Sequence, residues 1–231
     1  MIIKQLLDED FVNYKKASMF IGFPSCTFKC EKDINCSGMC QNSELMESPT
    51  IDISVEELVE RYVKNDITSA IVCGGLEPFD SFEDLYSFIK YLRVTKKNND
   101  DIVIYTGYYK SEILDKLIHI SNYKNIVIKY GRFIPDKESH FDDVLGIKLA
   151  SDNQYAEILK PLKYKIIKNP SLSETDVSDI LNDIKQNEGY CPCRWEKTPD
   201  NLCMCKEFRN FINDKKIGEC HCSLYSTIIS E

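Results

Sequence analysis

Cysteine is the residue type that most clearly points to chemistry in this 231-residue chain, which contains eleven cysteines. Structural disulfides are rare in a reducing cytoplasm, so this number favours metal binding or thiol redox chemistry. Only Cys73 stands alone, and the others fall into two groups that are far apart along the chain. The first group is Cys26, Cys30, Cys36 and Cys40, and the second is Cys191, Cys193, Cys203, Cys205, Cys220 and Cys222. Two separate cysteine sites are therefore predicted.

The first group begins with a C-x3-C pair, Cys26 and Cys30, in a segment that reads as a loop. Thiolates suit the soft chemistry of iron and sulfide, and cysteines usually hold a 4Fe–4S cluster. Three ligands on one loop would leave one iron open to another molecule. Four would close the cluster or form a zinc site, and the spacing alone does not choose among these.

The second group consists of three C-x-C pairs, whereas zinc sites favour C-x2-C spacing. Six thiols also exceed the four that one zinc ion or one 4Fe–4S cluster needs. Two thiols left beside a cluster would be able to form a redox disulfide. A zinc-bound fold is the alternative interpretation of this segment.

Alternating strands and helices are predicted in the first two thirds of the chain. Amphipathic or capped segments that begin near Ser54, Leu85 and Ile113 predict helices between four apolar runs. Cys73 ends one of these runs and is expected to be an ordinary buried strand residue. The predicted strands are Ala17–Phe23, Ala70–Cys73, Ile102–Tyr105 and Ile126–Ile128.

This alternation predicts an α/β fold of parallel β-α units. Four or so strands by residue 150 are too few for a complete eight-fold barrel, so a partial barrel is expected. The first cysteine loop, Gly74-Gly75 and Gly107 all follow predicted strand ends. Because ligands of α/β folds bind at that edge of the sheet, these segments are predicted to form one site.

The last third of the chain is predicted to be a separate small domain. Residues 161–172 read as a linker after a first domain at 1–160. Ser173 opens an amphipathic helix that Gly189 ends, so we expect 173–231 to form a mostly α-helical domain. Trp195 and Phe208 are expected to belong to its core.

Composition and charge exclude several classes of function. The net charge is −8 with a pI of about 5.1, and no basic block is present, so nucleic-acid binding is not expected. No stretch approaches the roughly 20 apolar residues that cross a membrane, and the first residues lack a signal-peptide pattern. A cytoplasmic protein is expected.

Residues 15–158 resemble the activating proteins of anaerobic ribonucleotide reductase, which belong to the radical SAM family. The shared features are the cysteine loop after the first strand and Gly74-Gly75-Leu76-Glu77-Pro78 after the second. Two departures are an extra residue, Leu76, in the glycine motif and nine residues between Cys30 and Cys40. Further similarity lies in Tyr105-Thr106-Gly107-Tyr108, Gly131-Arg132-Phe133 and Ser151-Asp152-Asn153-Gln154.

This resemblance implies a radical SAM-type partial barrel whose cluster binds S-adenosylmethionine and whose radical activates a glycine on a partner enzyme. It implies Cys26, Cys30 and Cys40 as cluster ligands, with Cys36 as the competing third ligand. The residues that the resemblance assigns to the cofactor are Gly74, Gly75, Glu77, Met39, Thr106 and Asn153.

Residues 173–228 resemble the catalytic subunit of ferredoxin–thioredoxin reductase, with Cys-Pro-Cys, Cys-x-Cys and Cys-His-Cys in the same order. The gaps between the pairs differ in length from that family. The resemblance implies that Cys193 and Cys222 form an active disulfide beside a cluster, with His221 as proton donor or acceptor. It also implies four cluster ligands, Cys191, Cys203, Cys205 and Cys220.

Together the two resemblances imply a redox enzyme with two 4Fe–4S clusters and S-adenosylmethionine that serves anaerobic ribonucleotide reduction. The expected partners are anaerobic ribonucleotide reductase or another glycyl-radical enzyme, a ferredoxin- or flavodoxin-type electron donor and a thioredoxin-like protein. One alternative is a disulfide reductase whose front module only carries electrons or docks a partner. The other alternative is a zinc-bound scaffold without enzymatic activity.

Overall fold

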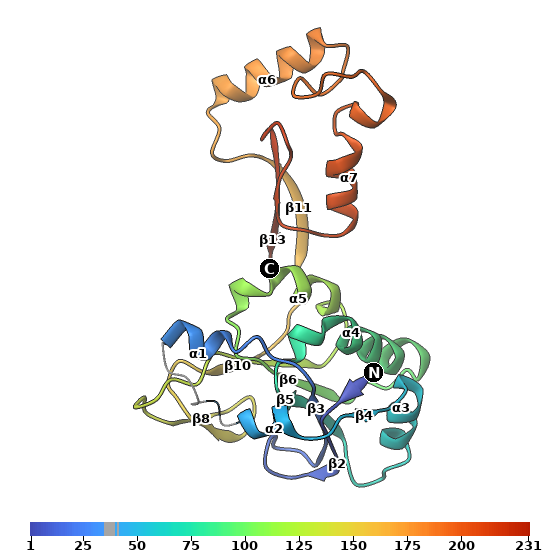
Figure 1. The fold of residues 1–231 in the computed structure, drawn as a ribbon, viewed down its shortest axis with the longest axis vertical. Coiled ribbons are helices and arrows are strands. Elements are labelled where there is room, and N and C mark those ends of the chain that lie inside the picture. Colours follow the sequence, from blue (N-terminus) through green and yellow to red (C-terminus); the bar gives the residue numbers. More distant parts are fainter. Residues whose placement is uncertain (35–39, 41) are drawn as a thin grey trace. The chain divides into compact units, whose positions relative to one another are not determined.

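The computed structural model describes residues 1–34, 40 and 42–231 of the chain. Its contacts divide the chain into two compact units, Met1–Lys160 and Pro161–Glu231, each described by itself below (Figure 1). Within the described residues, no helix has the length and apolar character needed to cross a membrane.

Unit 1 is built on a six-stranded sheet with the order β10-β7-β6-β5-β3-β2. The four central strands run parallel, and the two edge strands pair antiparallel to them. These strands are β2 (Gln5–Asp10), β3 (Ser18–Phe23), β5 (Ala70–Gly75), β6 (Asp101–Tyr105), β7 (Ile126–Tyr130) and β10 (Tyr155–Ile158).

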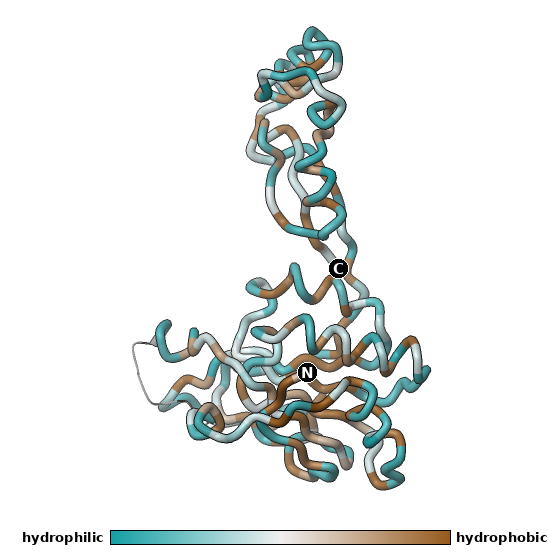
Figure 2. Tube along the Cα trace, turned by 45° about the vertical axis from the view of Figure 1, so that its right-hand side comes forward, coloured by the Kyte–Doolittle hydropathy of each residue, from teal (hydrophilic) through white to brown (hydrophobic). Residues whose placement is uncertain are grey.

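The central strands are apolar on both faces because the sheet is covered on both sides. The first four residues of β5, which include Cys73, are completely buried. Cys73 is thus an ordinary strand residue, as expected. Figure 2 shows the hydrophobic residues of unit 1 concentrated along these strands.

Helices connect the parallel strands, and α4 and α5 lie on the same side of the sheet in Figure 1. They are α3 (Val55–Val63), α4 (Phe82–Lys90) and α5 (Leu114–Ile120), with a π-helical turn, η2 (Tyr91–Thr95), continuing α4. Ser54 caps α3 by accepting a hydrogen bond from the backbone N–H of Glu57 at 3.0 Å. A separate core cluster joins alternate strand residues such as Val72 and Val103 to Leu145 and Leu149.

The remaining elements of unit 1 are short. Helices α1 (Lys29–Ile34) and α2 (Ser43–Glu47) follow β3, and short 3-10 turns begin at Pro78 (η1, Pro78–Ser81) and Lys110 (η3, Lys110–Glu112). Strands β1 (Ile2–Ile3) and β4 (Ile51–Asp52) pair together, as do β8 (His140–Asp142) and β9 (Ile147–Leu149). The sheet of unit 1 is open, and a partial barrel of the radical SAM type stays a prediction.

Unit 2 combines helices with a three-stranded antiparallel sheet of order β11-β13-β12. Residues 163–168, which we expected within a linker, form strand β11 (Lys163–Lys168) and pair along their whole length with β13 (Tyr225–Ser230). The expected linker is therefore wrong for these residues, which belong to a small sheet beside the helices of unit 2. The other elements are α6 (Glu174–Gln186), η4 (Pro199–Asn201), α7 (Lys206–Asn213) and β12 (Gly218–Glu219).

The core of unit 2 is small and includes two of its cysteines. Val177 of α6, Phe208 of α7 and Leu224 pack together with Cys205 and Cys220. Ser173 begins α6 with a reciprocal capping box to Asp176, as its sequence predicts. The cysteine segments are thus anchored to the core by residues on both helices.

Candidate cysteine sites

The first cysteine group lies directly after β3 and continues into α1. Cys26 and Cys30 are half-buried, and the Cys26 Sγ accepts a hydrogen bond from the Phe28 N–H at 3.2 Å. The Cys40 N–H donates to Glu31 Oε1 at 2.9 Å, which holds Cys40 against α1. Cys36 and Met39 lie outside the described residues, so the choice between Cys36 and Cys40 stays open.

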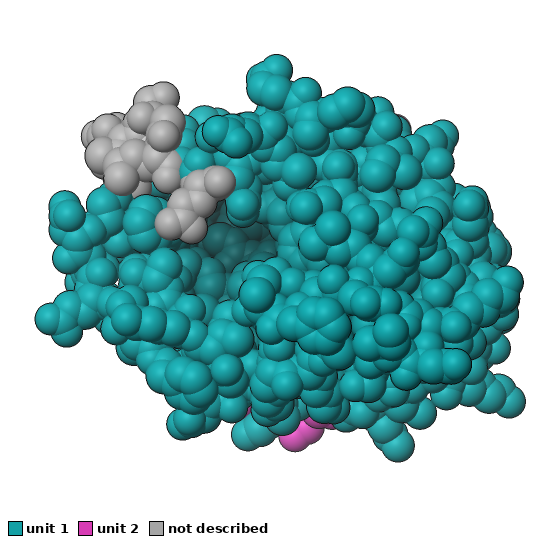
Figure 3. Space-filling view, turned by 90° about the horizontal axis from the view of Figure 1, so that it is seen from below, with its two compact units in different colours: residues 1–160 teal, residues 161–231 magenta. Residues whose placement is uncertain are grey.

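A pocket beside this loop gathers residues that the sequence places far apart. Figure 3 shows the hollowed face of unit 1. The residues that line the pocket are Cys26, Thr27, Lys29, Cys30, Glu77, Gly107, Tyr108 and Arg132. The carboxyl ends of β3, β5, β6 and β7 thus contribute to one site, as expected for an α/β sheet.

The thiols of this loop are in surroundings that disfavour bare thiolates. Burial raises the pKa of Cys26 to about 12, and the nearby carboxylates of Glu77 and Asp80 act in the same direction. Burial and the neighbouring Cys40 also raise the pKa of Cys30. A cationic iron centre would offset this penalty, because metal coordination deprotonates thiols. The donor set therefore fits a thiolate-held metal centre.

The two glycines that end β5 allow close approach of backbone and side chains from the protein itself. Gly75 has a φ of +80°, and a Cβ there would lie 2.8 Å from the Gly22 Cα of β3. Its carbonyl accepts a hydrogen bond from the Asn42 side chain at 2.7 Å. The motif thus joins the end of β5 to β3 and to the start of α2, and a role for Gly74 and Gly75 in cofactor binding stays a prediction.

The carboxylate of Glu77 is engaged within the protein. Its side chain accepts from the Phe79 N–H at 3.1 Å and from the Gly107 N–H at 2.9 Å, and it also pairs with Thr106. Burial raises its pKa to about 7, although these hydrogen bonds act against the rise. Glu77 and Thr106 therefore tie the end of β5 to the end of β6, and their predicted contact with a cofactor stays a prediction.

An ion-pair network borders the same pocket and was not found by sequence reasoning. Arg132, only 4% exposed, makes two hydrogen bonds to Glu112 at 2.8 and 2.9 Å and pairs with Asp33 at 2.9 Å. Glu112 also pairs with Lys29 of α1. The sequence offered only the Gly131-Arg132-Phe133 resemblance as a signal, without the partners.

Two buried polar atoms near this network have no hydrogen-bond partner among the described residues. They are Arg132 Nε and Asn153 Oδ1. The Asn153 amide nitrogen donates to the Arg132 carbonyl at 2.8 Å, which places Asn153 beside the pocket-lining arginine. Because buried polar groups are normally satisfied, these atoms mark a place where a bound molecule would find hydrogen-bonding groups.

In unit 2, the Cys-Pro-Cys segment forms a tight turn. The Arg194 N–H donates to the Cys191 carbonyl at 3.2 Å, which makes Cys191 the first residue of a four-residue turn and Cys193 the third. Cys191 is 3% exposed, whereas Cys193 is exposed. The turn therefore directs one thiol of the pair inward and the other outward.

The Cys-His-Cys segment repeats this arrangement. The Ser223 N–H donates to the Cys220 carbonyl at 2.8 Å, so Cys220 and Cys222 take the first and third positions of a turn. Cys220 is buried, Cys222 is half-buried and His221 is exposed. The Sγ atoms of Cys220 and Cys222 lie 3.5 Å apart, which is longer than the roughly 2.05 Å of a disulfide, and both are free thiols.

These turns bring the inward-facing cysteines of unit 2 to one pocket. All four cluster ligands implied by the resemblance line it, while Cys193 does not. Core residues Phe208 and Tyr225 close its sides. The lining residues are Cys191, Cys203, Met204, Cys205, Phe208, Cys220, His221, Cys222 and Tyr225.

The spacing of the donors bears on the kind of metal centre. Among residues 1–34, 40 and 42–231, no three Cys, His, Asp or Glu side chains converge on the position of a single metal ion. In a 4Fe–4S cluster each thiolate binds a different iron, so its ligands stand farther apart than those of one zinc ion. The choice between a cluster and a single zinc ion in unit 2 rests on the sequence pattern and stays a prediction.

The thiols of unit 2 that are implied to be redox-active have raised pKa values. Burial and the neighbouring Cys220 thiol raise the pKa of Cys222 to about 12. Burial and the neighbouring Cys191 also raise the pKa of Cys193. Cys222 thus lines the pocket itself, and Cys193 lies close enough to Cys191 to interact with it.

The two aromatic residues that we assigned to the core of unit 2 behave differently. Phe208 is 2% exposed and belongs to the core, as predicted. Trp195 is wrong as a core residue because its side chain is completely exposed. It follows the Cys191–Arg194 turn, which carries the chain outward.

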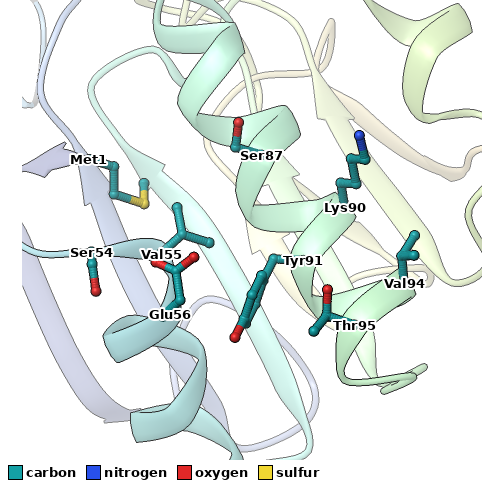
Figure 4. A pocket seen from close by; sticks show the side chains of 9 residues that line it. All are labelled: Met1, Ser54, Val55, Glu56, Ser87, Lys90, Tyr91, Val94 and Thr95. Atoms are coloured by element: carbon teal, nitrogen blue, oxygen red, sulfur yellow. The ribbon is translucent and has the colours of Figure 1, made fainter.

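A larger pocket of about 470 Å³ lies elsewhere in unit 1, between α3 and the α4–η2 segment (Figure 4). Its wall consists of Met1, Ser54, Val55, Glu56, Ser87, Lys90, Tyr91, Val94 and Thr95. It contains no cysteine or paired acid and base, so we do not assign the cysteine chemistry to it.

Cysteine-lined pockets beside an α/β sheet define a candidate iron–sulfur protein. Residues 15–155 match the model of the family described as the 4Fe-4S single cluster domain. The chain therefore belongs to this family, and the matched residues include the whole first cysteine group. No curated protein matches the chain. Unit 2 lies outside the matched residues.

Proposed function

We propose that the chain is a two-cluster redox enzyme in which unit 2 reduces disulfide bonds in a partner protein. Unit 1 belongs to the 4Fe-4S single cluster domain family, and its first cysteine group would supply the ligands. In unit 2, Cys191, Cys203, Cys205 and Cys220 would hold a second cluster. The observation that carries this proposal is that all four line one pocket while Cys193 faces outward.

When bound, the unit 2 cluster would supply electrons one at a time, which matches a ferredoxin- or flavodoxin-type donor. The residues around it would do the thiol chemistry. The exposed Cys193 thiolate attacks a target disulfide, forms a mixed disulfide and releases one target thiolate. Cys222 then attacks the Cys193 sulfur, which releases the second target thiolate and leaves a Cys193–Cys222 disulfide.

This exchange transfers two electrons to the target, and the two released thiolates take up two protons. His221, exposed between Cys220 and Cys222, is the side chain proposed to exchange protons with these thiols. Two successive single electrons from the donor then return Cys193 and Cys222 to thiols.

Replacement of Cys222 by serine tests this assignment. Cys222→Ser removes the resolving thiol, so catalytic turnover of a disulfide substrate is expected to stop after one mixed disulfide forms. Cys73→Ala is the matched control, because Cys73 is buried in β5 and outside both cysteine groups. Undiminished turnover by Cys222→Ser would reject the proposal.

A second function for unit 1 is reductive cleavage of S-adenosylmethionine, to activate anaerobic ribonucleotide reductase or another glycyl-radical enzyme. It is supported by the cysteine-lined pocket and by the unpartnered Arg132 Nε and Asn153 Oδ1 beside it. Reduced protein is expected to release 5′-deoxyadenosine from S-adenosylmethionine. If none forms, with or without the partner enzyme, unit 1 serves to carry electrons or to dock a partner.

A further inference from the structure

Trp195 is the only tryptophan of the chain, and its relative exposure is 101%. Burial of a large apolar side chain stabilises a folded protein, so a completely exposed indole adds no such stabilisation to unit 2. Tryptophan is also among the residues that most often anchor protein interfaces. If a partner protein buried this indole, the burial would stabilise the complex.

The position of Trp195 connects it to the proposed reaction. One residue separates it from Cys193, and two residues of extended chain span at most about 7 Å. Cys193 is itself exposed, and both residues emerge from the turn that begins at Cys191. The Cα atoms of Trp195 and Cys193 therefore lie within about 7 Å of each other.

The charged residues around Trp195 are largely paired within unit 2. Arg194 pairs with Glu207, and Lys206 with Asp200 at 3.0 Å. The segment 194–207 contains three basic and three acidic residues, so its formal charge is zero. In addition, Lys197 pairs with Glu188 at 3.3 Å. The charged residues that neighbour Trp195 in the sequence are thus mostly paired with acidic or basic partners within unit 2, and the exposed indole is the apolar group available to a partner.

We propose that Trp195 is the docking anchor for the protein whose disulfide Cys193 attacks. The indole packs on an apolar patch beside the partner's exposed disulfide and so holds that bond over Cys193. This inference rests on the proposed disulfide reductase function. A permanent partner or a second copy of this chain seated on Trp195 would cover Cys193, which must stay accessible for turnover, so the contact is transient.

Kinetics with a protein substrate and a small disulfide test this inference on the whole cluster-loaded protein. The probes are oxidised thioredoxin and 5,5′-dithiobis(2-nitrobenzoate). Trp195→Ala is expected to raise KM for thioredoxin about 10-fold or more and to leave kcat and small-disulfide turnover unchanged, as for an interface anchor. Trp195→Phe should restore most of the affinity.

Two further measurements separate docking from other effects. Because the proposed anchor is apolar and the neighbouring charges are mostly paired, KM for thioredoxin should change less than about two-fold between 50 and 300 mM salt. Phe141→Ala is the matched control, since Phe141 is another exposed aromatic, 62% exposed, in unit 1. It should leave every parameter unchanged.

The possible failures are distinguishable. If wild-type protein reduces no small disulfide, the proposed function itself fails. If it reduces the small disulfide and thioredoxin but Trp195→Ala leaves KM for thioredoxin unchanged, the docking role is overturned. Equal loss on both substrates would make Trp195 structural. A wild-type dimer that Trp195→Ala converts to a monomer, in sedimentation, would identify a second copy as the occupant and also overturn the proposal.

Discussion

Glu112 is predicted to fasten the first cysteine loop to the sheet. Its carboxylate holds the buried Arg132, which follows β7, through two hydrogen bonds at 2.8 and 2.9 Å. It also pairs with Lys29, the residue before Cys30 in α1. In Glu112→Gln this charge is lost, and the acidic partner that Arg132 keeps among the described residues is Asp33, whose side chain is 46% exposed.

The magnitude follows from the pKa of Glu112, which hydrogen bonds from Arg132 lower from 4.5 to about 2. At about 1.36 kcal/mol for each unit, this shift corresponds to an upper limit of roughly 3.4 kcal/mol at neutral pH. The side chain is 22% exposed, and solvent screening reduces the effect. We expect Glu112→Gln to lower the free energy of unfolding by about 2 kcal/mol.

The dependence on pH has a defined sign because the folded-state pKa is depressed. The stabilisation is fully present above the ordinary pKa of 4.5 and is lost as the pH falls through about 2. The difference between wild type and Glu112→Gln should therefore be constant from pH 8 to pH 6.

Anaerobic urea unfolding of unit 1, followed by far-ultraviolet circular dichroism, measures this difference. Glu60→Gln is the matched control, because Glu60 pairs with Lys96 at the surface and its loss should leave the midpoint nearly unchanged. A loss below about 0.5 kcal/mol in Glu112→Gln, or a difference that shrinks between pH 8 and pH 6, would refute the reasoning.

Three further changes test the packing of the fold by the same unfolding assay. Gly75→Ala should lower the free energy of unfolding by about 2 kcal/mol or more, because the φ of Gly75 is +80° and the new Cβ would lie 2.8 Å from Gly22 Cα. A neutral effect would contradict the close approach of β3 and β5. Leu224→Ala should destabilise unit 2 by about 2–5 kcal/mol, since Leu224 is completely buried in its core; unit 1 should be unaffected. Ser54→Ala should lower the free energy of unfolding by about 1 kcal/mol, because the α3 cap is lost. A change smaller than the experimental error would mean that the cap is not stabilising.

The central strands of unit 1 were predictable because their residues are apolar on both faces. Short continuous apolar runs such as Ala70–Cys73 and Ile126–Ile128 are typical of strands in a sheet that is covered on both faces. The helices that begin after Ser54 and Ser173 were predictable from local capping chemistry. In each case, the signal lies within a few consecutive residues.

Strand β11 was missed because its signal depends on a partner far away in the chain. Lys163–Lys168 is half polar, and it becomes a strand by pairing with Tyr225–Ser230 about sixty residues later. Trp195 was assigned to the wrong environment for a similar reason. Hydrophobicity indicates that an indole favours burial, whereas the structure shows this indole completely exposed.

The candidate sites were predictable in their residue types but not in their geometry. The sequence identified the cysteines, and the turns that direct Cys191 inward and Cys193 outward required the structure. The internal hydrogen bonds of Glu77 and the Glu112–Arg132 pair depend on side chains from several strands. No periodicity or spacing in the sequence reports such contacts.

The central claim is that each unit holds its own 4Fe–4S cluster. It is tested most directly by counting iron, acid-labile sulfide and zinc in anaerobically prepared protein. We predict about eight iron and eight sulfide in each chain, since each cluster contains four of both. The count should fall to about four of each in Cys26→Ser/Cys30→Ser and also in Cys203→Ser/Cys205→Ser. Zinc in place of iron, or a wild-type count of four that the unit 2 variant leaves unchanged, would contradict the account.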